Sequence, residues 1–347
     1  MVQLALQGYS GVALFMTLSG FLFVLICADK EIRTSGFYIN RLLRIYPLFL
    51  AALLLACYLD PVQNNFWSLM SSVFFMHNLP GGVYYPQFTE VLWTIPIEMQ
   101  FYLLFPLLLI FVRNYGLKYL FALLGLCIGI RLMIFIITGS AFQLGYTTIF
   151  GRLDQFIIGM LLGFAYRKVS SKFKHPFYLF ASIILTGSVL MLFSHLGGLI
   201  GSRTNPIWIV WSTLEGIIWG AIIFFYNASS FSFPKRLSQL LALGGTLSFS
   251  MYVSHFLFLN LCNRWYIPLV YCEHHRYSLF VATSNFLKMH PIASTCCFAF
   301  CLELPITIAA SILTYLIIEK PFLDLRSAYT KPNPQSISKQ TSQSVAA

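Results

Sequence analysis

The chain has 347 residues, of which 58% are hydrophobic and 10% are charged, and its formal net charge is +11 at pH 7. A soluble domain carries about 25% charged residues to cover its surface, so this composition excludes an ordinary water-soluble fold. Only helices or closed barrels satisfy their backbone groups inside a bilayer, and no alternating strands of the barrel type are visible. We therefore predict an all-α, polytopic transmembrane helix bundle.

The apolar residues gather in blocks of about the twenty that a helix needs to cross a roughly 30 Å hydrocarbon core. One further apolar stretch, residues 66–79, is too short to cross and is expected to form an interfacial or re-entrant helix. Nine spans are predicted, near residues 10–28, 45–59, 92–112, 119–137, 148–166, 177–196, 206–226, 246–262 and 293–318.

Most of the 22 lysines and arginines lie in alternate loops between these spans and in the C-terminal tail. By the positive-inside rule these loops are cytoplasmic. The net charge therefore reflects membrane topology, and nucleic acid is excluded as a partner. The residues concerned are Lys30, Arg33, Arg41, Arg44, Arg113, Lys118, Arg167, Lys168, Lys172, Lys174, Lys235, Arg236, Lys320, Arg326, Lys331 and Lys339.

This topology has consequences for both ends of the chain. It places Met1 outside, close to the first span and without a basic run or a cleavable signal. A preceding helix would bring the chain out from the cytoplasm, so residues 1–326 are interpreted as an N-terminally incomplete membrane domain. The polar residues 327–347 cannot bury enough apolar surface to order themselves, and we expect a disordered cytoplasmic tail.

Neither the cysteines nor the histidines predict a metal or disulfide framework. Six of the eight cysteines lie in apolar spans, where a thiol behaves as a small hydrophobe. Cys262 and Cys272 flank an outer loop and could pair only in an oxidising compartment. Glu273, His274 and His275 in that loop lack a fourth ligand for a metal, so no metal site is predicted.

Charged residues inside the spans are candidates for function, because a charge at bilayer depth costs at least about 2.5 kcal/mol. We expect them to line a polar cavity that opens outward, although they could instead neutralise one another and hold the bundle together. For Arg131 and Glu303 both interpretations stay open. Arg152 and Asp154 favour function, because residues two apart point to different sides of a helix. The set is Glu98, Arg131, Arg152, Asp154, Glu215, His255 and Glu303.

Arg41 and Arg44 precede the second span in the sequence RLLRIYP. Their three-residue spacing places both side chains on one helix face, where two guanidinium groups can clamp phosphate oxygens. Positive-inside anchoring is the simpler interpretation, and lysines would serve it equally well.

Six segments carry a recognisable combination of residues. GVALFMTLSGFLF (11–23) is an aromatic-rich run that ends in Ser-Gly-Phe, and FYINRLLRIYPLF (37–49) carries Arg-x-x-Arg before Tyr-Pro. WTIPIEMQFYLLFPLLL (93–109) combines Trp, Glu, Gln-Phe-Tyr and Pro. GRLDQFIIGMLLG (151–163), LGGTLSFSMYVSHFLF (243–258) and YLIIEKPF (315–322) follow in order. Together they resemble the acyltransferase 3 family of bacterial membrane O-acyltransferases over nearly the whole chain.

The sequence also departs from that family. The family has ten helices, and its first carries an Arg and a His that is the proposed catalytic base, whereas this sequence begins at the second helix. Ala13 stands where the family frequently has Asp, and Met99 stands where a second acid follows Glu98. The resemblance thus indicates the same missing helix that the loop charges predict.

The resemblance implies transfer of an acyl group, usually acetyl, from a cytoplasmic acyl-CoA to a hydroxyl of a cell-surface or lipid-linked glycan. The setting is the bacterial inner membrane, and acyl-CoA is a donor substrate rather than a bound cofactor. Arg41 and Arg44 would bind the phosphates of the donor. The acceptor cavity would be lined by Arg131, Arg152, Asp154 and Glu215, and the structural motif would comprise Ser19, Gly20, Trp93 and Tyr102.

A base must take the proton of the acceptor hydroxyl. In the chain as given, Glu98 is the first candidate and His255 the second, although a His in an aromatic stripe is more often a core residue. In the intact family, Glu98 would instead orient the His of the first helix. Two other hypotheses remain, a transporter of a small solute or glycan, and an inactive, truncated acyltransferase. Paired repeat halves, which many transporters show, are not visible.

Overall fold

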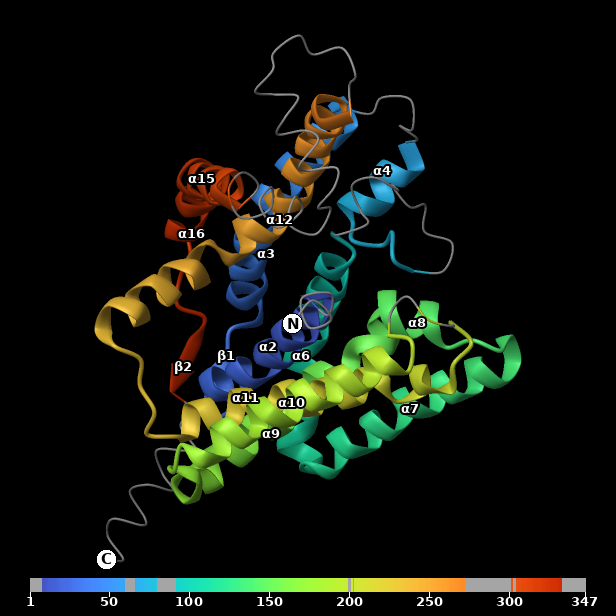
Figure 1. Cartoon of the computed structure of the whole chain (residues 1–347). Coiled ribbons are helices and arrows are strands. Elements are labelled where there is room, and N and C mark those ends of the chain that lie inside the picture. The colour runs from blue at the N-terminus through green and yellow to red at the C-terminus, as the bar shows by residue number, and fades with distance from the viewer. Residues whose placement is uncertain are drawn as a thin grey trace, which may run out of the picture.

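The protein is a bundle of helices with one short two-stranded ribbon, as the computed structural model in Figure 1 shows. The structure describes residues 8–59, 66–79, 92–198, 201, 203–271, 301 and 304–332. Six of the described helices are long and apolar enough to cross a membrane. Many large side chains on the bundle surface are apolar, including Ile136, Ile184 and Ile317, which suits a hydrocarbon solvent. The predicted polytopic helical membrane fold is confirmed.

Each predicted span overlaps a helix in its described residues, and residues 293–300 of the last predicted span lie outside them. The short predicted helix at residues 66–79 corresponds to α4 (Phe66–Val73). The helices that overlap the predicted spans are α2 (Gly11–Cys27), α3 (Thr34–Leu59), α6 (Thr94–Tyr115), α7 (Lys118–Thr138), α9 (Ile149–Val169), α10 (Phe177–His195), α11 (Trp211–Ala228), α12 (Lys235–Tyr271) and α15 (Leu304–Thr314). The shorter helical pieces are η1 (Gly8–Ser10), α8 (Phe142–Thr147), η3 (Ser170–Phe173), η4 (Pro206–Ile209), η6 (Tyr315–Glu319) and α16 (Lys320–Asp324).

The bounds of three helices differ from the predicted spans. The helix α3 begins at Thr34 rather than near residue 45, so Arg41 and Arg44 lie within it. Its polar first half is stabilised by tertiary contacts, because Phe37 and Asn40 are buried. The helix α12 extends the span predicted at residues 246–262 in both directions. The last span continues from α15 through the π-helical turn η6 into α16.

The helices α2 and α9 cross at backbone contact. A Cβ atom at Gly20 would overlap the carbonyl of Phe156, and one at Gly159 would overlap the carbonyl of Thr17. Small residues at such crossings allow two helix backbones to touch. Close packing of this kind stabilises helix pairs in a membrane, where no hydrophobic effect drives helices together. The helix α11 packs against both of these helices, so α2, α9 and α11 form the centre of the bundle.

The C-terminal segment up to residue 332 packs against the rest of the bundle. Strand β2 (Thr330–Pro332) pairs antiparallel with β1 (Lys30–Ile32), and Lys30 lies opposite Pro332. The amide of Asn40 donates to the carbonyl of Ser327 at 2.6 Å and accepts from its N–H at 3.2 Å. The prediction of a disordered tail from residue 327 is therefore wrong for residues 327–332, because α3 and β1 satisfy their backbone groups. Residues 333–347 lie outside the described part.

The basic loops meet at the ribbon end of the bundle. The guanidinium of Arg113, at the end of α6, donates to the carbonyl of Cys27 at 3.0 Å and also to that of Lys30. Arg167, at the end of α9, forms an ion pair with Asp29. The N–H of Ser230, after α11, donates to the carbonyl of Lys174 at 2.8 Å. These contacts place the basic loops on one side, as the charge pattern predicts.

Several predictions concern residues that the structure does not describe. The side chains of Cys262 and Cys272, Glu303, and the loop residues Glu273, His274 and His275 all belong to that group. Within the described ranges, no three His, Cys, Asp or Glu side chains gather in a way that could hold a metal ion.

Candidate functional site

A cavity of about 450 Å³ lies between α2, α3, α6, α9 and α12. Val12 and Ile26 of α2 both line it, and a helix rises about 1.5 Å per residue, so the cavity follows α2 for about 20 Å. Most of its wall is apolar. Its polar lining comprises Ser19, Arg41, Arg44, Thr94, Glu98, Tyr102, Ser248 and Tyr252.

Four aromatic rings surround the guanidinium of Arg41 at the wall of the cavity. Its guanidinium carbon lies 5.0 Å from the centroid of Phe23, 5.5 Å from Phe37, 5.6 Å from Tyr102 and 5.8 Å from Tyr329. Rings hold a guanidinium by its charge and its flat shape, but they accept few of its hydrogen bonds. Because Arg41 forms no ion pair with a carboxylate among the described residues, its charge remains available to an anionic ligand.

Arg44 lies one turn farther along α3 and has a loose carboxylate partner. Its nitrogen is 3.8 Å from an oxygen of Glu319, whose side chain is buried in the turn η6. The hydroxyl of Ser250 on α12 donates to the same carboxylate. The Arg44 side chain itself is 27% exposed. At 3.8 Å the pair is longer than a charge-assisted hydrogen bond, so donors of Arg44 remain available to a ligand.

Glu98 is half-buried and lies on the cavity wall of α6. The hydroxyl of Tyr102, one turn later on the same helix, donates to its carboxylate. The hydroxyls of Thr94 and Tyr252 lie 2.6 Å apart and join α6 to α12 beside it. Arg41 contacts the ring of Tyr102, so the arginine pair and the carboxylate belong to one continuous site.

His255, the second predicted base, lies on α12 but is not among the residues that line this cavity. Its Nδ1 atom is 2.8 Å from the carbonyl oxygen of Tyr252 and 3.1 Å from that of Met251. Carbonyl oxygens only accept, so Nδ1 carries the proton. The structure thus gives His255 a backbone partner on its own helix and does not bring it to Glu98 within the described contacts.

The four residues of the predicted structural motif lie in three different surroundings. Ser19 lines the cavity, whereas its neighbour Gly20 faces α9. Tyr102 also lines the cavity. Trp93 is buried, and its ring lies 5.6 Å from the guanidinium of Arg152.

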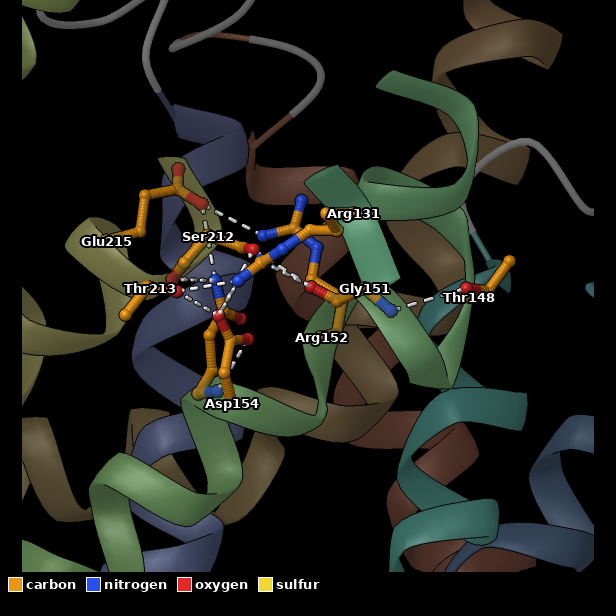
Figure 2. Close-up of polar contacts among 9 residues, drawn as sticks. Arg131, Thr148, Gly151, Arg152, Asp154, Ser212, Thr213 and Glu215 are labelled. Carbon is orange, nitrogen blue, oxygen red and sulfur yellow. Dashed lines mark hydrogen bonds and ion pairs between the residues drawn. The ribbon is translucent and has the colours of Figure 1, made fainter. Parts of the chain in front are cut away.

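A second polar cluster lies where α7, α9 and α11 meet (Figure 2). Arg131 donates to Asp154 at 2.8 Å, to the hydroxyl of Thr213 at 2.7 Å and to the carbonyl of Gly151 at 3.1 Å. The hydroxyl of Thr213 in turn donates a hydrogen bond to Asp154. Both charged side chains are completely buried, and several hydrogen bonds to each compensate for their loss of water.

The neighbouring ion pair joins Arg152 of α9 to Glu215 of α11. The two side chains are 2.8 Å apart and nearly fully buried. Arg152 also donates to the carbonyl of Tyr146 at 3.0 Å and lies 4.5 Å from the centroid of its ring. Gln155 donates to Glu215 at 3.3 Å and to the carbonyl of Ser212 at 3.0 Å. One positive and one negative charge cancel here, as they do at Arg131 and Asp154.

The structure therefore separates the intramembrane charges into two groups. Arg152 and Asp154 do not pair with each other, as expected, but each pairs with a residue on another helix. None of the four residues in this cluster lines the cavity that contains Glu98. This arrangement fits the alternative in which the charged residues neutralise one another and hold the bundle together. The cavity, in contrast, contains Arg41, which forms no ion pair among the described residues.

Glu319 and Tyr329 are among the residues of the site for which the sequence predicted no role. Glu319 lies in the segment YLIIEKPF, and a lone acid at the end of an apolar span was the signal for it. Tyr329, which packs over Arg41, lies in the segment expected to be disordered. Its position depends on the β1–β2 ribbon, for which the sequence has no signal.

Comparison with known proteins adds independent information. The model of a family described as an acyltransferase domain matches residues 2–317. A candidate O-acetyltransferase of Staphylococcus aureus strain COL is 24% identical over 287 residues, which cover 75% of this chain and 47% of the relative. The O-acetyltransferase OatA of S. aureus strain NCTC 8325 is 26% identical over 289 residues, with the same coverage. The chain thus spans about half the length of these curated relatives. No solved structure matches it.

Proposed function

This chain belongs to the acyltransferase 3 family, whose model covers residues 2–317, and from this premise we propose a specific reaction for it. The protein moves an acetyl group from a cytoplasmic acyl-CoA to a hydroxyl of a cell-surface or lipid-linked glycan, in the bacterial inner membrane. The observation that carries this proposal is the cavity that joins Arg41 and Arg44 to Glu98.

The cationic part of the cavity suits the donor. Guanidinium groups bind phosphate oxygens through paired hydrogen bonds, and the donors of Arg41 and Arg44 are not saturated by carboxylates in the described residues. The apolar length of the cavity beside α2 suits the uncharged arm that separates the phosphates of coenzyme A from its thioester. In this arrangement the thioester lies near Glu98.

Glu98 supplies the proton chemistry. The acceptor hydroxyl gives its proton to the Glu98 carboxylate as its oxygen attacks the thioester carbonyl, and general-base assistance of this kind contributes about 10²–10⁴-fold in rate. The carbon–oxygen bond forms and the carbon–sulfur bond breaks, and the leaving thiolate of coenzyme A takes the proton from Glu98, which returns to its carboxylate form. Tyr102 holds the carboxylate in place through its hydroxyl.

The basic end of the bundle is assigned to the cytoplasm. Arg113, Arg167 and Lys174 all make their contacts at that end, and lysine and arginine are retained on the cytoplasmic side of membranes. Coenzyme A thioesters would therefore enter from the ribbon end.

The test uses the full chain in lipid nanodiscs with radiolabelled acetyl-CoA and a saccharide acceptor. Arg44→Gln should reduce transfer at least tenfold, because hydrogen bonds to charged groups contribute about 1.5–3 kcal/mol each. Arg236→Gln removes an exposed arginine in the first turn of α12 and should leave transfer unchanged. Transfer that is indifferent to both Arg41 and Arg44 would reject the donor site, and solute flux without coenzyme A would favour a transporter.

A further inference from the structure

The C-terminal segment runs antiparallel along the face of α3 that carries Arg41 and Arg44. Glu319 contacts Arg44 at 3.8 Å, and Ser327 is held by both amide atoms of Asn40. Farther on, the carbonyl of Tyr329 accepts from the N–H of Arg33 at 2.8 Å. Figure 1 shows α16 and β2 beside α3 and β1. Residues 319–329 are therefore fixed against the proposed donor site at both ends.

Arg326 is carried by this segment, next to the anchored Ser327. Its N–H and its Nε atom both donate to the carbonyl of Leu323, at 3.2 and 3.0 Å. These two bonds fix the base of the guanidinium. Its terminal nitrogens make no hydrogen bond to any residue that the structure describes, so they are available to a ligand.

Two other arginines, Arg41 and Arg44, act on the guanidinium of Arg326. Partial desolvation, followed by repulsion from Arg44 and Arg41, lowers the pKa of Arg326 from its ordinary value. Among the carboxylates, Asp324 acts on Arg326, Glu319 lies beside Arg44, and Glu98 acts on both Arg44 and Arg41. Like charges held together by the fold oppose each other, and in proteins such arginine clusters are satisfied by phosphate groups.

We infer that Arg326 is a third arginine of the donor site and that it binds the 3′-phosphate of coenzyme A, while Arg41 and Arg44 bind the diphosphate. This inference rests on the proposed function. Coenzyme A carries its diphosphate on the arm that leads to the thioester, whereas its 3′-phosphate lies on the ribose, farther from the thioester. Arg41 and Arg44 line the cavity and Arg326 does not, so the order of the arginines matches the order of the phosphates.

The experiment compares two ligands that differ only in the 3′-phosphate. Binding of coenzyme A and of dephospho-coenzyme A is measured by calorimetry on the full chain in neutral phosphatidylcholine nanodiscs. The wild type should prefer coenzyme A by about tenfold or more, which is the effect of one charge-assisted phosphate contact. Arg326→Gln should remove this preference and leave dephospho-coenzyme A binding unchanged, which also shows that the variant is folded.

Four further variants isolate the cause of the preference for coenzyme A. Arg44→Gln should weaken both ligands together, and the exposed Arg236→Gln should weaken neither. Asn40→Ala releases Ser327 and should reduce the preference in the same direction as Arg326→Gln. Its control is Asn227→Ala, because the Asn227 amide donates only to a carbonyl of its own helix, that of Ile223, at 2.8 Å.

The outcomes separate the two proposals. If Arg326→Gln keeps the full preference, or weakens both ligands equally, the inference is overturned while the donor site stands. If the wild type binds neither ligand, the proposed function fails and the inference falls with it. A repeat in phosphatidylglycerol nanodiscs tests a lipid phosphate as the true ligand. If coenzyme A binding falls in those discs for the wild type but not for Arg326→Gln, Arg326 binds lipid and the inference is overturned.

Discussion

Glu98 and Tyr102 form the part of the site in which chemistry is proposed, and their hydrogen bond defines a first prediction. Glu98→Gln keeps the shape of the side chain but removes the proton acceptor. Acetyl transfer should fall by about 10²-fold or more, while binding of coenzyme A stays within about twofold of the wild type because the arginines are intact. Single-turnover transfer and calorimetric binding measure the two quantities separately.

Tyr102→Phe is the matched variant for this prediction. It retains the carboxylate but removes the hydroxyl that donates to it, so the loss of transfer should be smaller than for Glu98→Gln. Equal transfer by Glu98→Gln and the wild type would exclude Glu98 as the base.

The buried pair Arg131–Asp154 supports a second prediction, which separates a structural role from an acceptor-binding role. Asp154→Asn leaves Arg131 without its carboxylate at a completely buried site. Removal of one partner of a buried pair costs about 3–5 kcal/mol. We expect a marked fall in the thermal midpoint in detergent. The double variant Arg131→Met with Asp154→Leu removes both charges and should recover much of that loss.

Activity of the double variant then decides between the two roles. If the pair only holds the helices together, the double variant should transfer acetyl at close to the wild-type rate. If the pair binds the acceptor, as the family resemblance implies, the double variant should be stable and inactive. A double variant that is no more stable than Asp154→Asn would contradict the charge-pair argument itself.

For single residues, the sequence predicted which residues belong to the polar sites better than it predicted their ion-pair partners. The spacing of Arg41 and Arg44 implied a shared helix face, and both residues line one cavity. The same reasoning showed that Arg152 and Asp154 point apart, but not that their partners are Glu215 and Arg131. The rotation and register of α7 and α11 against α9 determine those partners, and neither can be inferred from the order of residues along one helix.

The contact between α2 and α9 provides a prediction about helices. Gly20→Ala would place a methyl group against the carbonyl of Phe156, which is a rigid backbone atom. Overpacking of this kind costs about 1–3 kcal/mol, so the thermal midpoint and the yield of folded protein should both fall. Because Ser19 lines the cavity beside this contact, coenzyme A binding should weaken as well.

The chain offers a matched control on α7. A Cβ atom at Gly129 meets nothing within 4 Å, and alanine favours a helix by up to about 1 kcal/mol over glycine. Gly129→Ala should therefore be neutral or slightly stabilising. Equal effects of the two substitutions would show that α2 and α9 are not held at backbone contact.

Helices of this protein were predictable where apolar composition determines them. The limits of α7 and α10 lie within one residue of the predicted spans, because hydrocarbon thickness sets the length of an apolar block. The first half of α3 and residues 327–332 were not predictable. Their order comes from contacts between segments far apart in the sequence, such as Asn40 with Ser327.

The whole molecule distributes its intramembrane charge unevenly. The sequence predicted one outward cavity lined by all the charged residues, whereas the structure pairs four of them in a neutral cluster and leaves Arg41 and Arg44 with Glu98 in a separate cavity. Depth along a span can be estimated from sequence, but the direction of a side chain around the helix axis depends on which neighbour the helix meets. This division of the charged residues into two groups could therefore be seen only in the structure.

The gathering of the basic loops at one end leads to a final prediction, on the orientation of the whole bundle. If that end is cytoplasmic, a reporter joined after Ser171 should lie inside the cell and one joined after Gly198 should lie outside, because α10 connects the two ends. Alkaline phosphatase is active only outside, so fusion after Gly198 should give high activity and fusion after Ser171 low activity. Green fluorescent protein at the same positions should give the reverse pattern. High phosphatase activity after Ser171 would place the three arginines on the outer side, where coenzyme A is absent, and would exclude the cytoplasmic donor on which the proposed reaction depends.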